Sequence, residues 1–197
     1  MFYTTDQRPP LPFNPFKALV APRPIGWISS LDPTGRANLA PYSFFNAVGQ
    51  DLVMFSSTGR KHSAANAIAT GEFVCNFVTY DLRDAMNSSS GPYGEDVDEF
   101  EVAGLEKARC RTVTAPRVAA APAALECRTV HSIELENSKG DRTGDVMIVG
   151  HVTAVHIDDE LLRDGRFDTL GADPIMRMGY KDYGRLGDRF EMDRPSA

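Results

Sequence analysis

Hydroxyl and basic side chains are concentrated in one short run, residues 56–63, which reads Ser-Ser-Thr-Gly-Arg-Lys-His-Ser. Arg60 can bind a phosphate through two nitrogens at once, whereas Lys61 supplies a compact point charge. In a chain whose formal net charge is −6, such a run is typical of a site for a single phosphate group. A polar, solvated turn between a strand and a helix is the alternative explanation.

An alanine-rich segment, residues 63–70, follows this run and ends at Gly71. Ser63 is a suitable N-cap and Gly71 a suitable C-terminal stop, so the spacing predicts a short helix. The free N–H groups and the dipole at the helix N-terminus would add to the attraction for an anion.

A second group of chemically capable residues spans residues 38–46, which read Asn-Leu-Ala-Pro-Tyr-Ser-Phe-Phe-Asn. Small residues and a proline beside hydrogen-bonding side chains allow a planar ligand to approach the backbone, whose amides can meet the polar edge of a heteroaromatic ring. Trp27 precedes this segment. The alternative is that Trp27, Phe44 and Phe45 are ordinary core residues.

Several kinds of site are not expected. The phosphate-binding, dinucleotide-binding and serine-hydrolase glycine motifs do not occur in the sequence. His151 and His156 are five residues apart in a predicted strand and would face opposite sides, so no metal site is expected. No protein nucleophile or general base is expected either.

The chain contains three cysteines, Cys75, Cys110 and Cys127. Because their number is odd and no Cys-x-x-Cys spacing occurs, we expect them to be reduced.

The composition is that of an ordinary globular chain of 197 residues, 42% hydrophobic and 24% charged. The acidic balance excludes a general nucleic-acid binder. Residues 8–62 nevertheless hold six basic and two acidic residues, whereas residues 81–106 hold one basic and eight acidic residues. No apolar segment is long enough to span a membrane, and the N-terminal residues lack the pattern of a signal peptide. We therefore expect a cytoplasmic protein without a membrane partner.

The elements that must position these residues are mostly strands joined by turns. This pattern favours an antiparallel barrel or sandwich over an alternating α/β fold. We expect one domain over residues 1–197, with an extended arm at 1–15 and a C-terminal extension at 158–197 that packs on the barrel or on a partner chain. The expected strands are residues 25–31, 38–45 with a break at Pro41, 52–56, 73–78, 124–135 and 146–157; the expected helices are 63–70 and 81–88.

Three longer motifs make the sequence similar to a known family. They are residues 22–30 (PRPIGWISS), residues 38–46 (NLAPYSFFN), and Phe55-Ser56 followed by residues 60–63 (RKHS). Shorter matches follow in order at residues 98–100, 104–105, 125–127 and 150–152. Over residues 15–180 the chain resembles the flavin reductase-like, FMN-binding split-barrel family, in the branch of flavoredoxin and the reductase component of nitrilotriacetate-type monooxygenases.

The resemblance implies a homodimeric, mainly β fold: an antiparallel, Greek-key-like split barrel with a few peripheral helices and FMN near the subunit interface. It implies that residues 38–46 line the flavin ring, that the run from Ser56 holds the phosphate, and that residues 177–180 can approach the flavin from the partner chain. The cofactor-binding residues it implies are Trp27, Ser29, Asn38, Ala40, Pro41, Ser43, Phe44, Phe45, Asn46, Ser56, Arg60, Lys61 and Ser63.

The implied activity is hydride transfer from NAD(P)H to FMN, with reduced flavin supplied to a partner monooxygenase. One departure from the family pattern bears on this activity, because Gly144-Asp145-Val146 stands where shorter members carry Gly-Asp-His. An FMN-binding electron-transfer protein without NAD(P)H activity is therefore the second hypothesis. A barrel that binds neither flavin nor phosphate is the third.

Overall fold

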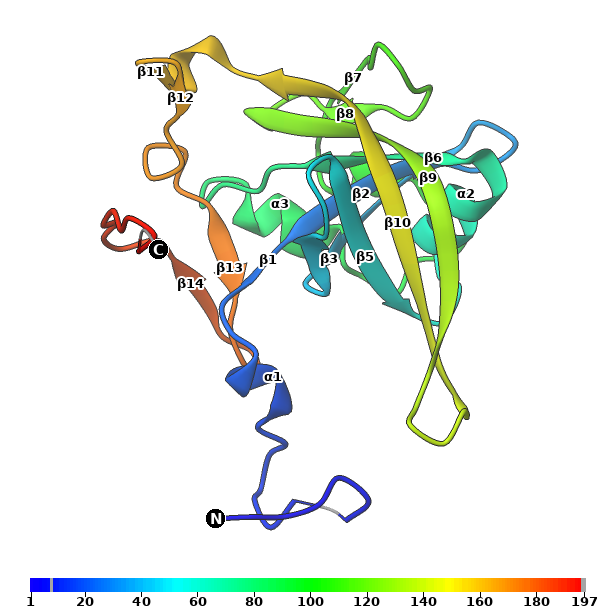
Figure 1. Cartoon of the computed structure of the whole chain (residues 1–197). Helices are drawn as coiled ribbons and strands as arrows, with labels where there is room; N and C mark the ends of the chain where they lie inside the picture. Colours follow the sequence, from blue (N-terminus) through cyan, green and yellow to red (C-terminus); the bar gives the residue numbers. More distant parts are fainter. Residues whose placement is uncertain (8, 196–197) are drawn as a thin grey trace.

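The computed structural model describes residues 1–7 and 9–195. Its centre is an antiparallel seven-stranded sheet with the strand order β3-β2-β6-β9-β10-β5-β4, curled into a half-barrel (Figure 1). The expected mainly β, antiparallel architecture is therefore confirmed. The strands of this sheet are β2 (Gly26–Leu31), β3 (Ala37–Tyr42), β4 (Phe45–Ala47), β5 (Leu52–Thr58), β6 (Glu72–Asn76), β9 (Ala123–Glu136) and β10 (Arg142–Ile157).

The strand break in residues 38–45 lies two residues later than expected. Pro41 stays within β3 and pairs with Trp27, and the chain leaves the ladder at residues 43–44 before β4 begins. Proline is tolerated here because β3 is an edge strand of the sheet, so the missing N–H removes no ladder bond from an outer partner.

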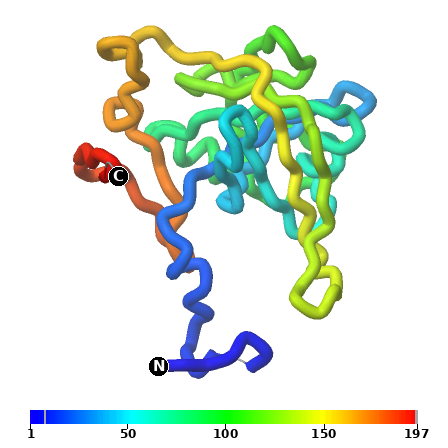
Figure 2. The backbone as a smooth tube through the Cα atoms, viewed as in Figure 1, coloured from blue at the N-terminus to red at the C-terminus, as the bar shows by residue number. Residues whose placement is uncertain are grey.

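Strands β9 and β10 form the long hairpin expected from the turn residues 137–141. Asn137 Oδ1 accepts hydrogen bonds from the N–H groups of Lys139 and Asp141, which closes the turn. The register shifts three times along the pair. The tip of the hairpin extends well beyond the rest of the sheet (Figure 2).

The helices are short and peripheral. α2 (His62–Thr70) is the longest of those described, and the others are α1 (Phe16–Leu19), α3 (Arg83–Ser88), α4 (Glu99–Val102) and the 3-10 helix η1 (Asp159–Leu161). α2 ends at Gly71, whose φ of 73° is left-handed, as expected. The expected N-cap was wrong, because Lys61 occupies that position and makes no side-chain capping bond. Among the described residues, no helix is long and apolar enough to cross a membrane.

The buried core lies inside the curled sheet and under α2. Its centre includes Phe55 and Phe73, whose rings meet edge to face with centroids 5.2 Å apart. Gly150 makes this packing possible, since a Cβ there would lie 2.4 Å from Phe73 Cζ. A second cluster surrounds Trp27, which is completely buried.

The C-terminal segment returns to the start of the barrel. β13 (Ile175–Arg177) pairs with β1 (Arg23–Pro24) on one side and with β14 (Tyr183–Arg185) on the other. Residues 1–15 contain neither helix nor strand where described, and the chain leads away from the barrel to the N-terminus (Figure 2). The remaining short strands are β7 (Lys107–Ala108), β8 (Arg117–Val118), β11 (Leu162–Arg163) and β12 (Arg166–Phe167).

Candidate functional site

A cavity of about 470 Å³ lies where the end of β3, the start of α2 and the loop after α3 meet. Its walls are polar on the α2 side and formed by small residues on the β3 side. Six of the thirteen residues predicted to bind a cofactor line it, and they come from both predicted motifs; these six are Asn38, Ala40, Pro41, Arg60, Lys61 and Ser63.

The N-terminus of α2 borders this cavity. The first N–H groups of a helix have no partner inside the helix, and Lys61 provides no side-chain cap. His62, Ser63 and Lys61 all line the cavity at this point. The positive end of the helix dipole therefore coincides with basic side chains, an arrangement that favours an anion.

Arg60 is held away from the helix by an ion pair. Its Nη2 lies 2.9 Å from Glu134 Oε1 on the hairpin, and 62% of the Arg60 side chain is exposed. Exposed ion pairs contribute only about 0–1 kcal/mol to stability. Glu134 is also paired with Arg142 at 2.5 Å, so Arg60 can turn toward an anion without leaving that carboxylate unpaired.

A chain of buried hydrogen bonds fixes the wall formed by β3. Ser63 Oγ donates to Asn38 Oδ1 at 2.7 Å, and Asn38 Nδ2 donates to Glu99 Oε1 at 2.8 Å. Glu99 is 4% exposed, and its other oxygen accepts the N–H of Leu39 at 3.1 Å. Both polar atoms of the Asn38 amide are thus engaged, which locks its orientation and ties α2 to α4 across β3.

Tyr42 adds a phenol to the wall of the cavity. Burial raises the pKa of Tyr42, and the nearby hydroxyls of Ser63 and Ser57 only partly oppose this shift. The phenol therefore remains protonated well beyond neutral pH and keeps a hydrogen that it can donate.

Trp27 and Ser29 do not reach the cavity, because both are completely buried in β2. Trp27 Nε1 donates to Ser89 Oγ at 2.8 Å, so the ring lies behind the cavity wall and supports the loop that forms it. Ser29 Oγ donates to the carbonyl of Pro116 at 2.6 Å.

The second half of the 38–46 motif turns away from the cavity. Phe44 lies beneath Lys17, whose Nζ is 5.4 Å from the ring centroid. Phe45 lines a separate apolar cavity of about 310 Å³. Asn46 is exposed and accepts a hydrogen bond from the N–H of Ala47. Only the first half of the motif therefore lies at the α2 cavity within one chain.

Two more of the predicted residues, Ser43 and Ser56, are half-buried outside this cavity. Ser43 lies between β3 and β4, and Ser56 on β5 donates its N–H to the carbonyl of Phe44 at 2.8 Å. The segment 177–180 does not line the cavity of its own chain either. It is anchored to β1, because Arg23 Nη2 donates to the carbonyl of Met178 at 2.8 Å.

The loop at residues 89–95 forms the wall that sequence reasoning missed. Ser89 both accepts from Trp27 Nε1 and donates to the carbonyl of Met86, and Tyr93 donates to the carbonyl of Ser88. The serine, glycine and proline content of this segment indicates a loop, but contains no signal for a binding wall. One sequence feature does indicate where Glu99 lies. Asp98 is a good N-cap, so Glu99 is expected in the first turn of a helix, α4.

The donors at this cavity suit a phosphate monoester. They combine two permanent cations and the N–H groups of a helix N-terminus, and the surrounding small residues allow close approach.

The chain is similar to known proteins over most of its length. Residues 19–171 match the family described as "Flavin reductase like domain". A protein from Halalkalibacterium halodurans is 33% identical over 184 residues, covering 90% of this chain and 88% of the relative.

Among solved structures, nitrilotriacetate monooxygenase component B from Bacillus cereus superposes with a TM-score of 0.88 at 27% identity, covering 98% of each chain. Flavoredoxin of Desulfovibrio vulgaris has the same fold, with a TM-score of 0.78 at 19% identity over 98% of this chain and 97% of that one. The mainly β architecture is accordingly a split barrel, and the chain belongs to the flavin reductase-like family.

Proposed function

We propose that the protein is an oxidoreductase that binds FMN in the cavity at the start of α2 and passes hydride to it from NAD(P)H. Family membership supports a flavin-related oxidoreductase. The observation that carries the choice of FMN is the convergence of Arg60, Lys61 and the α2 N-terminus on one cavity. The ribityl chain of riboflavin ends in a neutral hydroxyl, whereas FMN ends in an anionic phosphate monoester that can pair with both cations.

The chain's own residues would bind and orient the cofactor. Lys61 and the first backbone N–H groups of α2, including that of Ser63, would hold the phosphate, and Arg60 would join them from the hairpin side. Ala40 and Pro41 present a flat, close wall to the ring. FMN itself supplies the redox chemistry when bound, so the protein contributes proximity and orientation, which can lower a barrier by about 7–11 kcal/mol in favourable cases.

The proposal includes a homodimer. Several apolar side chains remain exposed on β9, β10 and the loop after β4, among them Val130, Ile133 and Val155. Phe44, Phe45 and Asn46 lie outside the cavity of their own chain, which would leave them free to contact the flavin of a second chain. The proposal also includes a flavin-dependent monooxygenase as acceptor of the reduced flavin, and a cytoplasmic location, which suits three free cysteines.

Steady-state oxidation of NADH and NADPH with added FMN tests the activity. A flavin-dependent rate with at least one of the two nucleotides supports the proposal. The absence of a rate with both nucleotides, in a protein that quenches FMN fluorescence on binding, would contradict hydride transfer and leave only flavin binding.

A second function, an FMN-binding electron carrier, is favoured by one observation. Val146 stands where shorter relatives carry the histidine of Gly-Asp-His, and its side chain is buried in the core cluster at 5% exposure. It therefore offers a nicotinamide neither a hydrogen bond nor an open surface. A yellow protein that purifies with one FMN per chain and oxidises neither nucleotide would support the carrier.

A further inference from the structure

Three side chains capable of binding a metal converge at a place that does not line the α2 cavity. The Sγ of Cys110, a carboxylate oxygen of Glu126 and a ring nitrogen of His156 all lie within 4.8 Å of one another. Glu126 is on β9, His156 is on β10, and Cys110 lies in the loop between β7 and β8. No spacing motif marks this group, because strand pairing and a loop bring together residues that are far apart in the chain.

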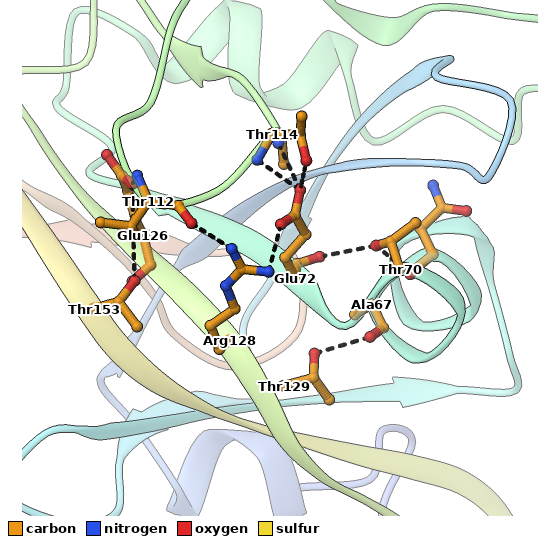
Figure 3. Close-up of polar contacts among 11 residues, drawn as sticks. Ala67, Thr70, Glu72, Thr112, Thr114, Glu126, Arg128, Thr129 and Thr153 are labelled. Atoms are coloured by element: carbon orange, nitrogen blue, oxygen red, sulfur yellow. Dashed lines mark hydrogen bonds and ion pairs between the residues drawn. The ribbon is translucent and has the colours of Figure 1, made fainter.

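The carboxylate of Glu126 is held rigidly by the loop that carries Cys110. It accepts hydrogen bonds from the N–H groups of Arg111 at 2.8 Å and Thr112 at 2.5 Å, and from Thr112 Oγ1 at 2.6 Å. Figure 3 shows Glu126 beside Thr112 and Thr153, and the Oγ1 atoms of these two threonines lie 2.5 Å apart. Such outer contacts orient a ligating carboxylate before any ion arrives.

The burial of the group also suits a cation. The Glu126 side chain is completely buried, and a carboxylate away from water needs cationic or hydrogen-bonding partners to compensate it. A divalent cation between the three side chains would be such a partner.

We propose that Cys110, Glu126 and His156 bind one Zn²⁺ ion. Thiolate, imidazole and carboxylate are the ligands that Zn²⁺ takes, and tetrahedral coordination separates neighbouring ligand atoms by about 3.5 Å. His156 Nε2 lies 2.5 Å from Glu126 Oε1, so small side-chain movements would admit the ion. Zinc binding breaks this hydrogen bond. The imidazole gives up its Nε2 proton to solvent and takes one on Nδ1, so that the neutral ring binds the ion through Nε2 while the carboxylate of Glu126 binds it through oxygen. A zinc–sulfur bond forms as the thiol proton of Cys110 leaves to solvent.

One of the three side chains, His156, borders a cavity. His156 lines a cavity of about 340 Å³ together with Arg117 and Asp158. The Nε of Arg117 is buried without a hydrogen-bond partner among the described residues. An anionic fourth ligand, such as hydroxide or a small carboxylate, would suit a cavity that contains this guanidinium. Three protein ligands with one open position are the pattern of reactive rather than purely structural zinc sites.

Zinc binding to the flavin-loaded protein tests the proposal directly. Chelator-treated and dialysed protein is titrated with Zn²⁺ alone, and bound metal is measured by equilibrium dialysis with elemental analysis. The expected result is one zinc per chain. Co²⁺ in place of Zn²⁺ should give the near-ultraviolet charge-transfer absorption that a thiolate ligand produces.

Single substitutions test which side chains bind the zinc ion. Cys110→Ser and His156→Ala should each weaken zinc binding by at least the roughly 10- to 100-fold that loss of an outer contact costs, and Thr112→Val should fall within that range. Cys110→Ser should also abolish the cobalt charge-transfer band. His151→Ala removes an exposed histidine from the same strand and should bind zinc as the parent does.

A parent protein that binds no zinc overturns the proposal, and so does a stoichiometric zinc that survives both ligand substitutions unchanged. If Cys110→Ser does not fold, the cobalt spectrum of the parent protein still shows whether a thiolate binds the metal. Its charge-transfer band reports a thiolate ligand, and cobalt bound without that band overturns the site.

Discussion

Glu99 and Asn38 are joined by a buried hydrogen bond of 2.8 Å between Oε1 and Nδ2. The same carboxylate also accepts the N–H of Leu39, and Asn38 in turn accepts from Ser63 at the start of α2. A residue from the acidic segment 81–106 therefore holds the β3 wall of the cavity in register with the start of α2. At least one acidic residue of that segment is thus structural rather than a solvated surface charge.

We predict that Glu99→Gln weakens both stability and flavin binding. One oxygen becomes an NH₂ group that must face a donor, either Asn38 Nδ2 or the N–H of Leu39. Leaving such a buried donor unpaired costs about 1–3 kcal/mol. Urea unfolding should show a loss of this size, and FMN and riboflavin should both bind more weakly, since the change affects the wall and not the phosphate donors. Glu101→Gln, at an exposed position of the same helix, is the control and should change neither. Equal stability of the two variants would contradict the prediction.

The raised pKa of Tyr42 predicts a loss of stability at alkaline pH. In the unfolded chain this phenol ionises near the ordinary tyrosine pKa of 10.0, whereas in the folded chain burial raises the pKa and keeps the phenol protonated to higher pH. Its contribution to stability is therefore complete below pH 10 and declines as the pH rises toward the folded pKa. The free energy of unfolding of Tyr42→Phe should fall less steeply above pH 10 than that of the parent.

The matched control is Tyr183→Phe, because Tyr183 is 46% exposed. Its alkaline stability profile should follow that of the parent. A Tyr42→Phe profile parallel to the parent profile would show that the Tyr42 phenol titrates alike in the folded and unfolded states.

Gly150 should not tolerate a side chain. A Cβ at this position would lie 2.4 Å from Phe73 Cζ and 3.1 Å from Cys127 Cβ, in the middle of the core. Overpacking of this kind costs about 1–3 kcal/mol, so Gly150→Ala should lower the urea midpoint with little effect on the slope of the transition. Gly187→Ala is the control, because a Cβ there would have no described atom within 4 Å apart from the glycine itself and its two chain neighbours. A Gly150→Ala variant as stable as the control would mean that the Phe73 ring moves aside at no cost.

Local signals predicted most of the sheet. Short sequence patterns were enough to recognise the strands at residues 124–135 and 146–157 and the turn between them, because the alternation of side chains, Asn137 and Gly140 are all local features. The same holds for α2 and its end at Gly71. Pairing between β13 and β1 could not be predicted, since it joins segments about 150 residues apart through backbone groups that every residue carries.

The candidate site was predictable in its residue types but not in its geometry. The basic run and residues 38–41 do meet at one cavity. By contrast, the sequence does not tell whether the indole N–H of Trp27 donates to a ligand or to another residue. Only the fold shows that its partner is Ser89. The pairing of Arg60 with Glu134 also depends on the twist of a hairpin, which local composition does not encode.

The phosphate donors give the sharpest test of the proposed FMN site. Arg60→Ala combined with Lys61→Ala should weaken FMN binding strongly and riboflavin binding little, because riboflavin lacks the phosphate. A hydrogen bond to a charged group contributes about 1.5–3 kcal/mol, so each side chain should account for a roughly 10- to 100-fold change in FMN affinity. Titration of flavin fluorescence with both ligands measures the difference directly.

Arg142→Ala provides a matched control for this test. Arg60 and Arg142 both pair with Glu134, so removing either one leaves that carboxylate with one cationic partner. The two substitutions therefore change the net charge equally and disturb the hairpin to a similar extent, but only Arg60 lines the cavity. Arg142→Ala should consequently leave the ratio of FMN to riboflavin affinity unchanged, whereas Arg60→Ala alone should lower it. If both single variants lower the ratio of FMN to riboflavin affinity equally, the effect comes from the overall positive charge near the hairpin and not from a contact between Arg60 and the phosphate. If neither changes the ratio, the phosphate lies outside the cavity at the start of α2.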